Sequence, residues 1–69
     1  MTPSEVVQWM NQEVEVSNFS VSGRFRLTAY IFRVIDNKKF YQAEVQNLKP
    51  PHEIYIVSLA DVKGANNDE

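Results

Sequence analysis

The sequence predicts a mainly β domain in which one N-terminal helix precedes an antiparallel β-sheet. Apolar residues recur at spacings of three and four up to Val14, which is the helical period, and alternate with polar residues afterwards. The chain has 69 residues, which leaves room for one domain and no more. We therefore expect a single domain over residues 1–63, followed by a disordered acidic tail at residues 64–69.

The first element is predicted to be a helix at about residues 3–13. Thr2 suits its N-cap, Pro3 suits the first helical position, and Glu5 completes a Thr-x-x-Glu capping box. A single amphipathic helix of this length persists only when its apolar face packs on another element. The apolar stripe consists of Val6, Val7, Met10 and Val14, with Trp9 beside it, and Trp9 suits either the core or an interface.

Strands are predicted over about residues 14–63. The first strand begins at Val14 and ends before the Ser22-Gly23 turn, and residues 24–35 form the longest β-prone run. One face of this run is mostly apolar, whereas the other is polar near its start and apolar from Tyr30 onward. This change of face predicts a strong bend or a bulge within the strand.

Two further strands and a short last one complete the predicted sheet. Residues 36–39 (Asp-Asn-Lys-Lys) give the clearest turn signal, and residues 40–48 alternate between apolar and polar. The two prolines at 50–51 interrupt the sheet, because proline has no amide to donate to a hydrogen-bond ladder. A strand follows at about residues 54–59, and a short one at residues 60–62.

Composition restricts the functions that the chain can have. It contains no cysteine and a single histidine, so neither a disulfide nor a zinc site is expected. The formal net charge is −2 and the pI is about 5.3, so attraction to nucleic acid or to an anionic membrane requires a local basic patch. The first residues lack the features of a signal peptide, and no apolar run approaches the roughly 20 residues of a membrane span. We therefore expect a cytoplasmic protein.

No combination of residues indicates catalysis. A nucleophile needs a base within reach, and the only ordinary base is His52, which lies in the proline-containing loop. Glu44 and Glu53 can approach one another across strands, but charges on the solvated face of a sheet are the commoner interpretation. The only glycines, Gly23 and Gly64, exclude a Gly-rich phosphate-binding loop. We expect a binding or assembly protein without enzyme activity, cofactor or metal.

Basic and aromatic residues in the middle of the chain favour a binding function. Single-stranded nucleic acids are bound by cations that contact phosphates and by flat rings that stack on bases. The alternative interpretation is structural, with phenylalanines in the core and an Arg-x-Arg pair on the solvated side of a strand. The basic residues are Arg24, Arg26, Arg33, Lys38, Lys39 and Lys49, and the rings are those of Tyr30, Phe32, Phe40, Tyr41 and Tyr55.

Several short motifs follow one another along residues 3–63 in a characteristic order. They are the Val-Glu-Val-Ser sequence at 14–17, Ser22-Gly23, the apolar Leu27, Ala29 and Ile31, the turn at 36–40 and the sequence at 54–62. In residue type and order they resemble the Sm-like family, and in particular its bacterial branch, the Hfq RNA chaperones. The resemblance implies an SH3-like fold in which the N-terminal helix lies on a bent five-stranded antiparallel barrel.

The resemblance also implies a ring and an RNA ligand. In the family, six or seven subunits join by strand pairing, which here places residues 53–58 against residues 60–62 of the next subunit. A homohexamer is the expected assembly, and single-stranded RNA is its expected ligand, with Phe40 and Tyr55 as base-stacking residues near the pore. The RNA-binding candidates are Gln8, Gln12, Arg24, Arg26, Lys38, Lys39, Phe40 and Tyr55. The subunit-interface candidates are Glu53, Ile54, Tyr55, Ile56, Val57, Ser58, Ala60, Asp61 and Val62.

The sequence departs from the family at positions that bind RNA. Ile56 and Val57 stand where the bacterial proteins have a lysine and a histidine, and Met10, Asn11 and Glu13 replace basic residues late in the helix. We therefore expect a ring-forming post-transcriptional regulator whose RNA binding is weak or atypical, or which has shifted to protein partners. The alternative is a small non-enzymatic adaptor or inhibitor domain, monomeric or dimeric, that docks on a larger protein.

Overall fold

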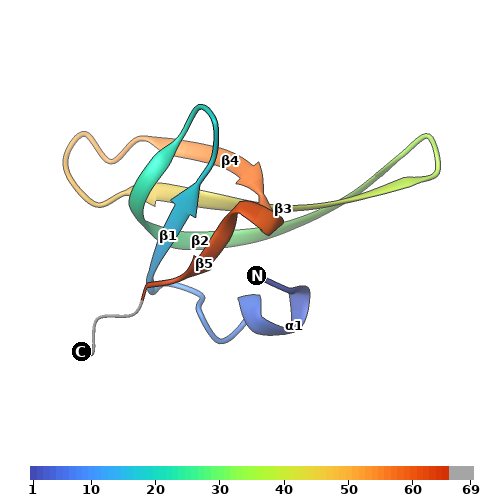
Figure 1. The fold of residues 1–69 in the computed structure, drawn as a ribbon, viewed down its shortest axis with the longest axis horizontal. Coiled ribbons are helices and arrows are strands. Elements are labelled where there is room, and N and C mark those ends of the chain that lie inside the picture. The colour runs from blue at the N-terminus through green and yellow to red at the C-terminus, as the bar shows by residue number, and fades with distance from the viewer. Residues whose placement is uncertain (66–69) are drawn as a thin grey trace.

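Residues 1–65 are described by the computed structural model of this chain, and they form an antiparallel sheet with a short N-terminal helix (Figure 1). The prediction of a mainly β domain is confirmed. The elements in chain order are α1 (Pro3–Val6), β1 (Glu13–Ser17), β2 (Ser22–Ile35), β3 (Lys38–Asn47), β4 (Ile54–Ser58), the 3-10 turn η1 (Leu59–Asp61) and β5 (Val62–Gly64).

The five strands lie in the order β4-β3-β2-β1-β5. Every pair of neighbours is antiparallel, so this part of the prediction is also confirmed. β4 and β5 are the two edges, and within residues 1–65 the sheet does not close into a barrel. Each edge strand therefore has one side without a partner strand, which is the arrangement that favours pairing with another chain.

The helix is much shorter than the predicted residues 3–13. Its start is as expected, because the Glu5 carboxylate accepts hydrogen bonds from the Thr2 amide at 2.8 Å and the Thr2 hydroxyl at 3.1 Å, which lowers the pKa of Glu5. Its regular part ends at Val6, and turns lead to Asn11, which has a φ of 65°. The Asn11 amide donates to the Leu27 carbonyl at 2.7 Å. Backbone pairing with β2 therefore replaces the last turns of the predicted helix.

The core lies on one face of the sheet, beneath the N-terminal segment. Alternate residues of each strand point into it, as expected for a sheet that is buried on one side. The core consists of Val6, Val14, Val16, Phe25, Leu27, Ala43, Val45, Val57, Leu59 and Val62.

A β-bulge divides β2 at Thr28. The register with β3 shifts between Leu27 and Ala29, and the Thr28 hydroxyl donates to the Glu44 carbonyl at 3.1 Å or to its carboxylate at 2.8 Å. The extra residue exchanges the two faces of the strand, so that Tyr30 follows Leu27 on the core side. The bend or bulge expected from the change of polarity is thereby confirmed.

The C-terminal part differs from the prediction in two respects. Residues 59–61 form the 3-10 turn, where the Ser58 hydroxyl accepts a hydrogen bond from the Ala60 amide at 3.3 Å, and the last strand begins only at Val62. Gly64 belongs to β5 and Ala65 is buried, so these two residues are not part of a disordered tail. Residues 66–69 of the predicted tail lie outside the described residues.

Trp9 packs against the core and lies directly on Gly64. It is half-buried, and a Cβ atom added at Gly64 would overlap its indole ring. Position 64 therefore accommodates no side chain unless the indole of Trp9 moves. Of the two roles that the sequence leaves open for Trp9, the structure assigns packing within the protomer.

Gly64→Ala is expected to destabilise the protein by about 1–3 kcal/mol, because the new methyl group must displace the indole of Trp9. The measurement is urea unfolding followed by the fluorescence of Trp9, the only tryptophan. Lys63→Ala is the matched control, since Lys63 is exposed on the same strand and its distance to Glu15 is 3.8 Å. Equal stability of Gly64→Ala and the control would contradict the packing of Trp9 on β5.

Candidate functional site

The far part of the β2–β3 hairpin projects from the sheet as a two-stranded ribbon (Figure 1). β1 pairs with β2 only up to Arg26, and β4 pairs with β3 only from Gln42 onward. The connecting residues Asp36 and Asn37 both have positive φ angles, 52° and 64°, as in the tight turns that suit strand twist. We call residues 31–41 the projecting hairpin.

One face of the projecting hairpin carries a pair of aromatic rings. Phe32 lies opposite Tyr41, and their ring centroids are 5.3 Å apart with an interplanar angle of 40°. Lys39 follows on the same face, opposite Val34. Phe32 is 50% exposed and Tyr41 is 42% exposed, so the ring pair is open to a ligand.

The opposite face combines a third ring with a positioned guanidinium group. Phe40 lies opposite Arg33, and the Nε of Arg33 donates to the side-chain oxygen of Gln42 at 2.9 Å. Lys38 follows on this face, opposite Ile35. Each face of the hairpin therefore presents both aromatic surface and positive charge.

Charge is distributed unevenly along the chain. The projecting hairpin contains three of the seven Lys and Arg residues but only one of the nine Asp and Glu residues, which gives it a formal charge of +2. The remaining four basic and eight acidic residues leave −4 for the rest of the chain. A local basic patch is thus present on a protein whose net charge is negative.

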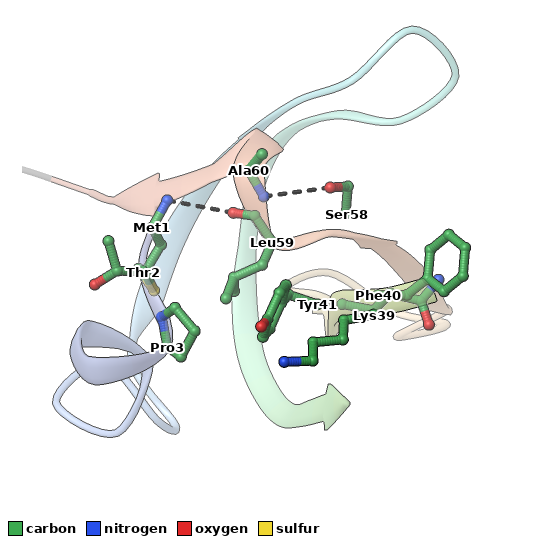
Figure 2. Close-up of a pocket in the computed structure, with 10 residues that line it drawn as sticks. Met1, Thr2, Pro3, Lys39, Phe40, Tyr41, Ser58, Leu59 and Ala60 are labelled. Atoms are coloured by element: carbon green, nitrogen blue, oxygen red, sulfur yellow. Dashed lines mark hydrogen bonds between the residues drawn. The ribbon is translucent and has the colours of Figure 1, made fainter. Parts of the chain in front are cut away.

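A cavity of about 430 Å³ lies where the chain leaves β4 and the first residues approach β3 (Figure 2). Lys39 and Tyr41 project from β3 toward Met1 and Pro3, whereas the ring of Phe40 is turned away. The α-amino group of Met1 donates to the Val62 carbonyl at 2.7 Å and to the Leu59 carbonyl at 3.3 Å. These bonds hold the N-terminal wall of the cavity against the C-terminal part of the sheet.

Arg24 and Arg26, both RNA-binding candidates, lie on the outer side of β2 near its start. Arg24 forms an ion pair with Glu13 across to β1, with 2.7 Å between Nη1 and Oε2. Arg26 donates from Nη1 to the carbonyl of Asn11 at 2.9 Å. Both guanidinium groups are engaged within the protomer, which reduces what they offer to phosphate.

Gln8 and Gln12 are exposed in the turns after α1, where the side-chain Nε2 of Gln12 donates to the backbone carbonyl of Gln8 at 2.9 Å. They do not share an extended helix face, because the helix ends before them.

The structure does not bring Phe40 and Tyr55 together within one protomer. Tyr55 lies opposite Val45, which is five residues along β3 from Phe40, or about 16 Å at the usual rise of a strand. The ring of Tyr55 packs edge-on against Phe25 with the centroids 5.8 Å apart, and its hydroxyl donates to Glu53 at 2.5 Å. Of the predicted RNA-binding residues, only Lys38, Lys39 and Phe40 share the projecting hairpin.

The subunit-interface candidates lie on the edge strand β4 and around η1. Ile54 and Ile56 are 55% and 45% exposed, whereas Val57 and Val62 are buried in the core. The carboxylate of Asp61 accepts a hydrogen bond from the side-chain Nδ2 of Asn18 at 2.7 Å and so holds the β1–β2 loop. The remaining candidates are Glu53, Ser58 and Ala60, which are exposed, and Tyr55, which is half-buried.

Comparisons with protein-family models, curated proteins and solved structures give no match to this chain. Within residues 1–65, no helix is both long and apolar enough to span a membrane. The same residues contain no group of three or more His, Asp or Glu side chains placed to hold a metal ion.

Sequence reasoning missed the cavity and the N-terminal residues that line it. Thr2 and Pro3 were expected only at the start of a helix, yet together with Met1 they line the cavity beside β3, about 40 residues later in the chain. The signal that points to the hairpin itself is the grouping of aromatic and basic residues on both sides of the turn at Asp36 and Asn37.

The hydrogen bond from Tyr55 to Glu53 raises the pKa of Tyr55 above its usual value of 10.0. Absorbance titration at alkaline pH should show a tyrosine component that ionises above the usual value of 10.0, and Tyr55→Phe should remove this component. Glu53→Ala should lower the pKa of Tyr55 toward the ordinary value. In the unfolded chain Tyr55 loses its proton at a lower pH than in the native protein, so the hydrogen bond to Glu53 gives its full stabilisation of the native state below pH about 10. This stabilisation is lost as the pH rises through the native pKa of Tyr55. A titration unchanged by Glu53→Ala would contradict the bond.

Proposed function

We propose that this chain is a non-enzymatic assembly module of the Sm-like type that forms a homo-oligomeric ring and binds single-stranded RNA weakly or atypically. The strand order β4-β3-β2-β1-β5 carries the proposal, because it leaves one unpaired edge at each end of a single sheet. Pairing of β4 in one subunit with β5 in the next uses different surfaces on the two partners. Such contacts are heterologous and generate a ring when the rotation between subunits closes.

The size of the domain supports assembly. A chain of about 60 residues buries only about 60% of the surface that its unfolded form exposes, and cysteine is absent, so it has no disulfide for compensation. Exposed apolar residues also lie on β4, where Ile54 and Ile56 flank the unpaired edge. Pairing that edge would satisfy its backbone groups and cover part of this apolar surface.

The RNA part of the proposal is supported by the basic and aromatic character of the projecting hairpin. Ile56 and Val57 offer no positive charge on β4, so a contact of the kind seen in the bacterial family at its pore would be weak here. Ring formation therefore has support from the sheet, and RNA binding has support from a different part of the molecule.

The second candidate function is a protein-binding adaptor or inhibitor that acts as a monomer or dimer. The observation that favours it is the number of large apolar side chains open to solvent in so small a domain. They are Val7, Phe19, Phe32, Val34, Ile35, Phe40, Tyr41, Leu48, Ile54 and Ile56.

Light scattering on a size-exclusion column should give a mass of about six or seven times the 8.0 kDa protomer. The double variant Ile54→Lys and Ile56→Lys should shift the mass to the protomer, because lysines on an edge strand oppose pairing with another chain. Phe19→Lys is the matched control, since Phe19 is fully exposed in the β1–β2 loop and belongs to neither edge strand.

A monomeric or dimeric wild type would exclude the ring and leave the adaptor function. The ratio of absorbance at 260 and 280 nm across the same peak reports co-purified nucleic acid. Electrophoretic titration with uridine-rich and adenine-rich RNA at low salt tests the RNA part independently of the mass.

A further inference from the structure

We infer that the projecting hairpin and the cavity beside it form one binding site for single-stranded RNA, in which a base enters the cavity against Tyr41 and Lys39 contacts the adjoining phosphate. This inference rests on the RNA part of the proposed function and gives that function a location. The site does not include Arg24 or Arg26, and it does not use Phe40 and Tyr55 as a pair of stacking residues.

The cavity has the size and lining that a nucleotide requires. Its volume of about 430 Å³ lies within the range of about 300–1,000 Å³ that is usual for small-molecule sites. Met1, Pro3 and Leu59 supply apolar surface opposite the ring of Tyr41 (Figure 2). The polar lining comes from Thr2, Gln42 and Ser58, of which Thr2 and Ser58 carry hydroxyl groups that can meet base edges, and the lining contains no acidic side chain.

The stacking surface continues outside the cavity. The ring of Phe32 is centred 5.3 Å from that of Tyr41, on the same face and directly across the ribbon on β2. Successive bases of a single strand stack on such neighbouring rings with little regard for sequence. A strand that leaves the cavity and crosses from β3 to β2 therefore meets a second ring.

The charges needed for the phosphates are present and are not neutralised by acidic neighbours. The ion pairs among residues 1–65 involve Arg24 and Lys63, and neither Lys38 nor Lys39 takes part in one. Arg33 lies on the opposite face of the hairpin from Tyr41, where its Nε donates to Gln42 and its two terminal nitrogens are not used in that bond. The formal charge of +2 on the hairpin complements the phosphate backbone, whereas the remainder of the chain repels it.

A peptide strand added to the open edge of β3 is the competing occupant of the same cavity. β4 stops pairing at Gln42, so the backbone of residues 38–41 has an open side. Two consecutive lysines on this stretch oppose strand addition, since edge lysines are a common device against it. The same lysines favour a polyanion, and the observations therefore support RNA.

The test is fluorescence anisotropy with labelled 12-nucleotide oligouridine and oligoadenine at several salt concentrations. Tyr41→Ala should weaken binding about 10-fold through loss of one stacked base, whereas Tyr41→Phe keeps the ring and should bind like the wild type. Log affinity falls as log salt rises, and Lys39→Gln should make this fall less steep by about 0.7, as expected for one lost phosphate contact. Lys49→Gln, in the β3–β4 loop, is the charge-matched control and should leave affinity unchanged.

The outcomes separate this inference from the proposed function. RNA binding by the wild type that persists in Tyr41→Ala and Lys39→Gln would overturn the inference and leave RNA binding at another surface. A wild type that binds neither oligonucleotide would overturn both the inference and the RNA part of the proposed function, while the mass measurement still reports the ring. Hairpin variants that alter the mass but not the affinity would assign the hairpin to subunit contacts and overturn the inference.

Discussion

The bulge at Thr28 is the constraint on which the rest of the structure depends. The Thr28 hydroxyl bonds to the carbonyl or carboxylate of Glu44, and the extra residue exchanges the two faces of β2. In a regular strand, Tyr30 and Phe32 would lie on the solvated side, away from Leu27. With the bulge, one strand contributes Leu27 to the core and Phe32 to the aromatic face of the projecting hairpin. The core and the candidate site are therefore parts of one continuous β-ladder.

The N-terminal segment connects these two parts. Asn11 pairs with Leu27 just before the bulge, and Trp9 packs on Gly64 of the last strand. The amino group of Met1 binds the Val62 carbonyl at 2.7 Å, so the first residues are fixed against the opposite end of the chain. The helix ends at Val6, and the segment packs against the core through Trp9 and Met10 while its first residues form one wall of the cavity.

Local patterns predicted the elements whose causes are local. Period-two alternation indicated the strands, the sequence at residues 36–39 indicated the tight turn, and the change of polarity indicated the bulge. The helix was predicted too long because Val6 and Val14 share a helical spacing, although one enters the core from α1 and the other from β1. The pairing of Asn11 with Leu27 that ends the helix is a tertiary contact, which no local pattern contains.

The candidate site was harder to predict for the same reason. Arg24 is neutralised by Glu13 through the register of β1 and β2, and the cavity forms only because the first residues meet β3. Both facts depend on contacts between distant parts of the chain, whereas the basic and aromatic content of the hairpin is visible in the sequence alone.

If the ring and the RNA site form as proposed, the number of subunits has a consequence for affinity. The proposed ring uses the edges of β4 and β5, and the projecting hairpin is paired with neither of them, although Ser58 at the end of β4 and Ala60 after it also line the cavity. One hairpin offers a few cations and two neighbouring rings on its cavity face, which would be a weak site for a single strand. In the proposed ring, several hairpins would raise the effective concentration of the second and later contacts, and the combined affinity would then exceed that of one hairpin by about 10²–10⁴ without any new contact. An acidic protein with a small basic hairpin would in this way bind RNA more tightly as an assembly than as a protomer.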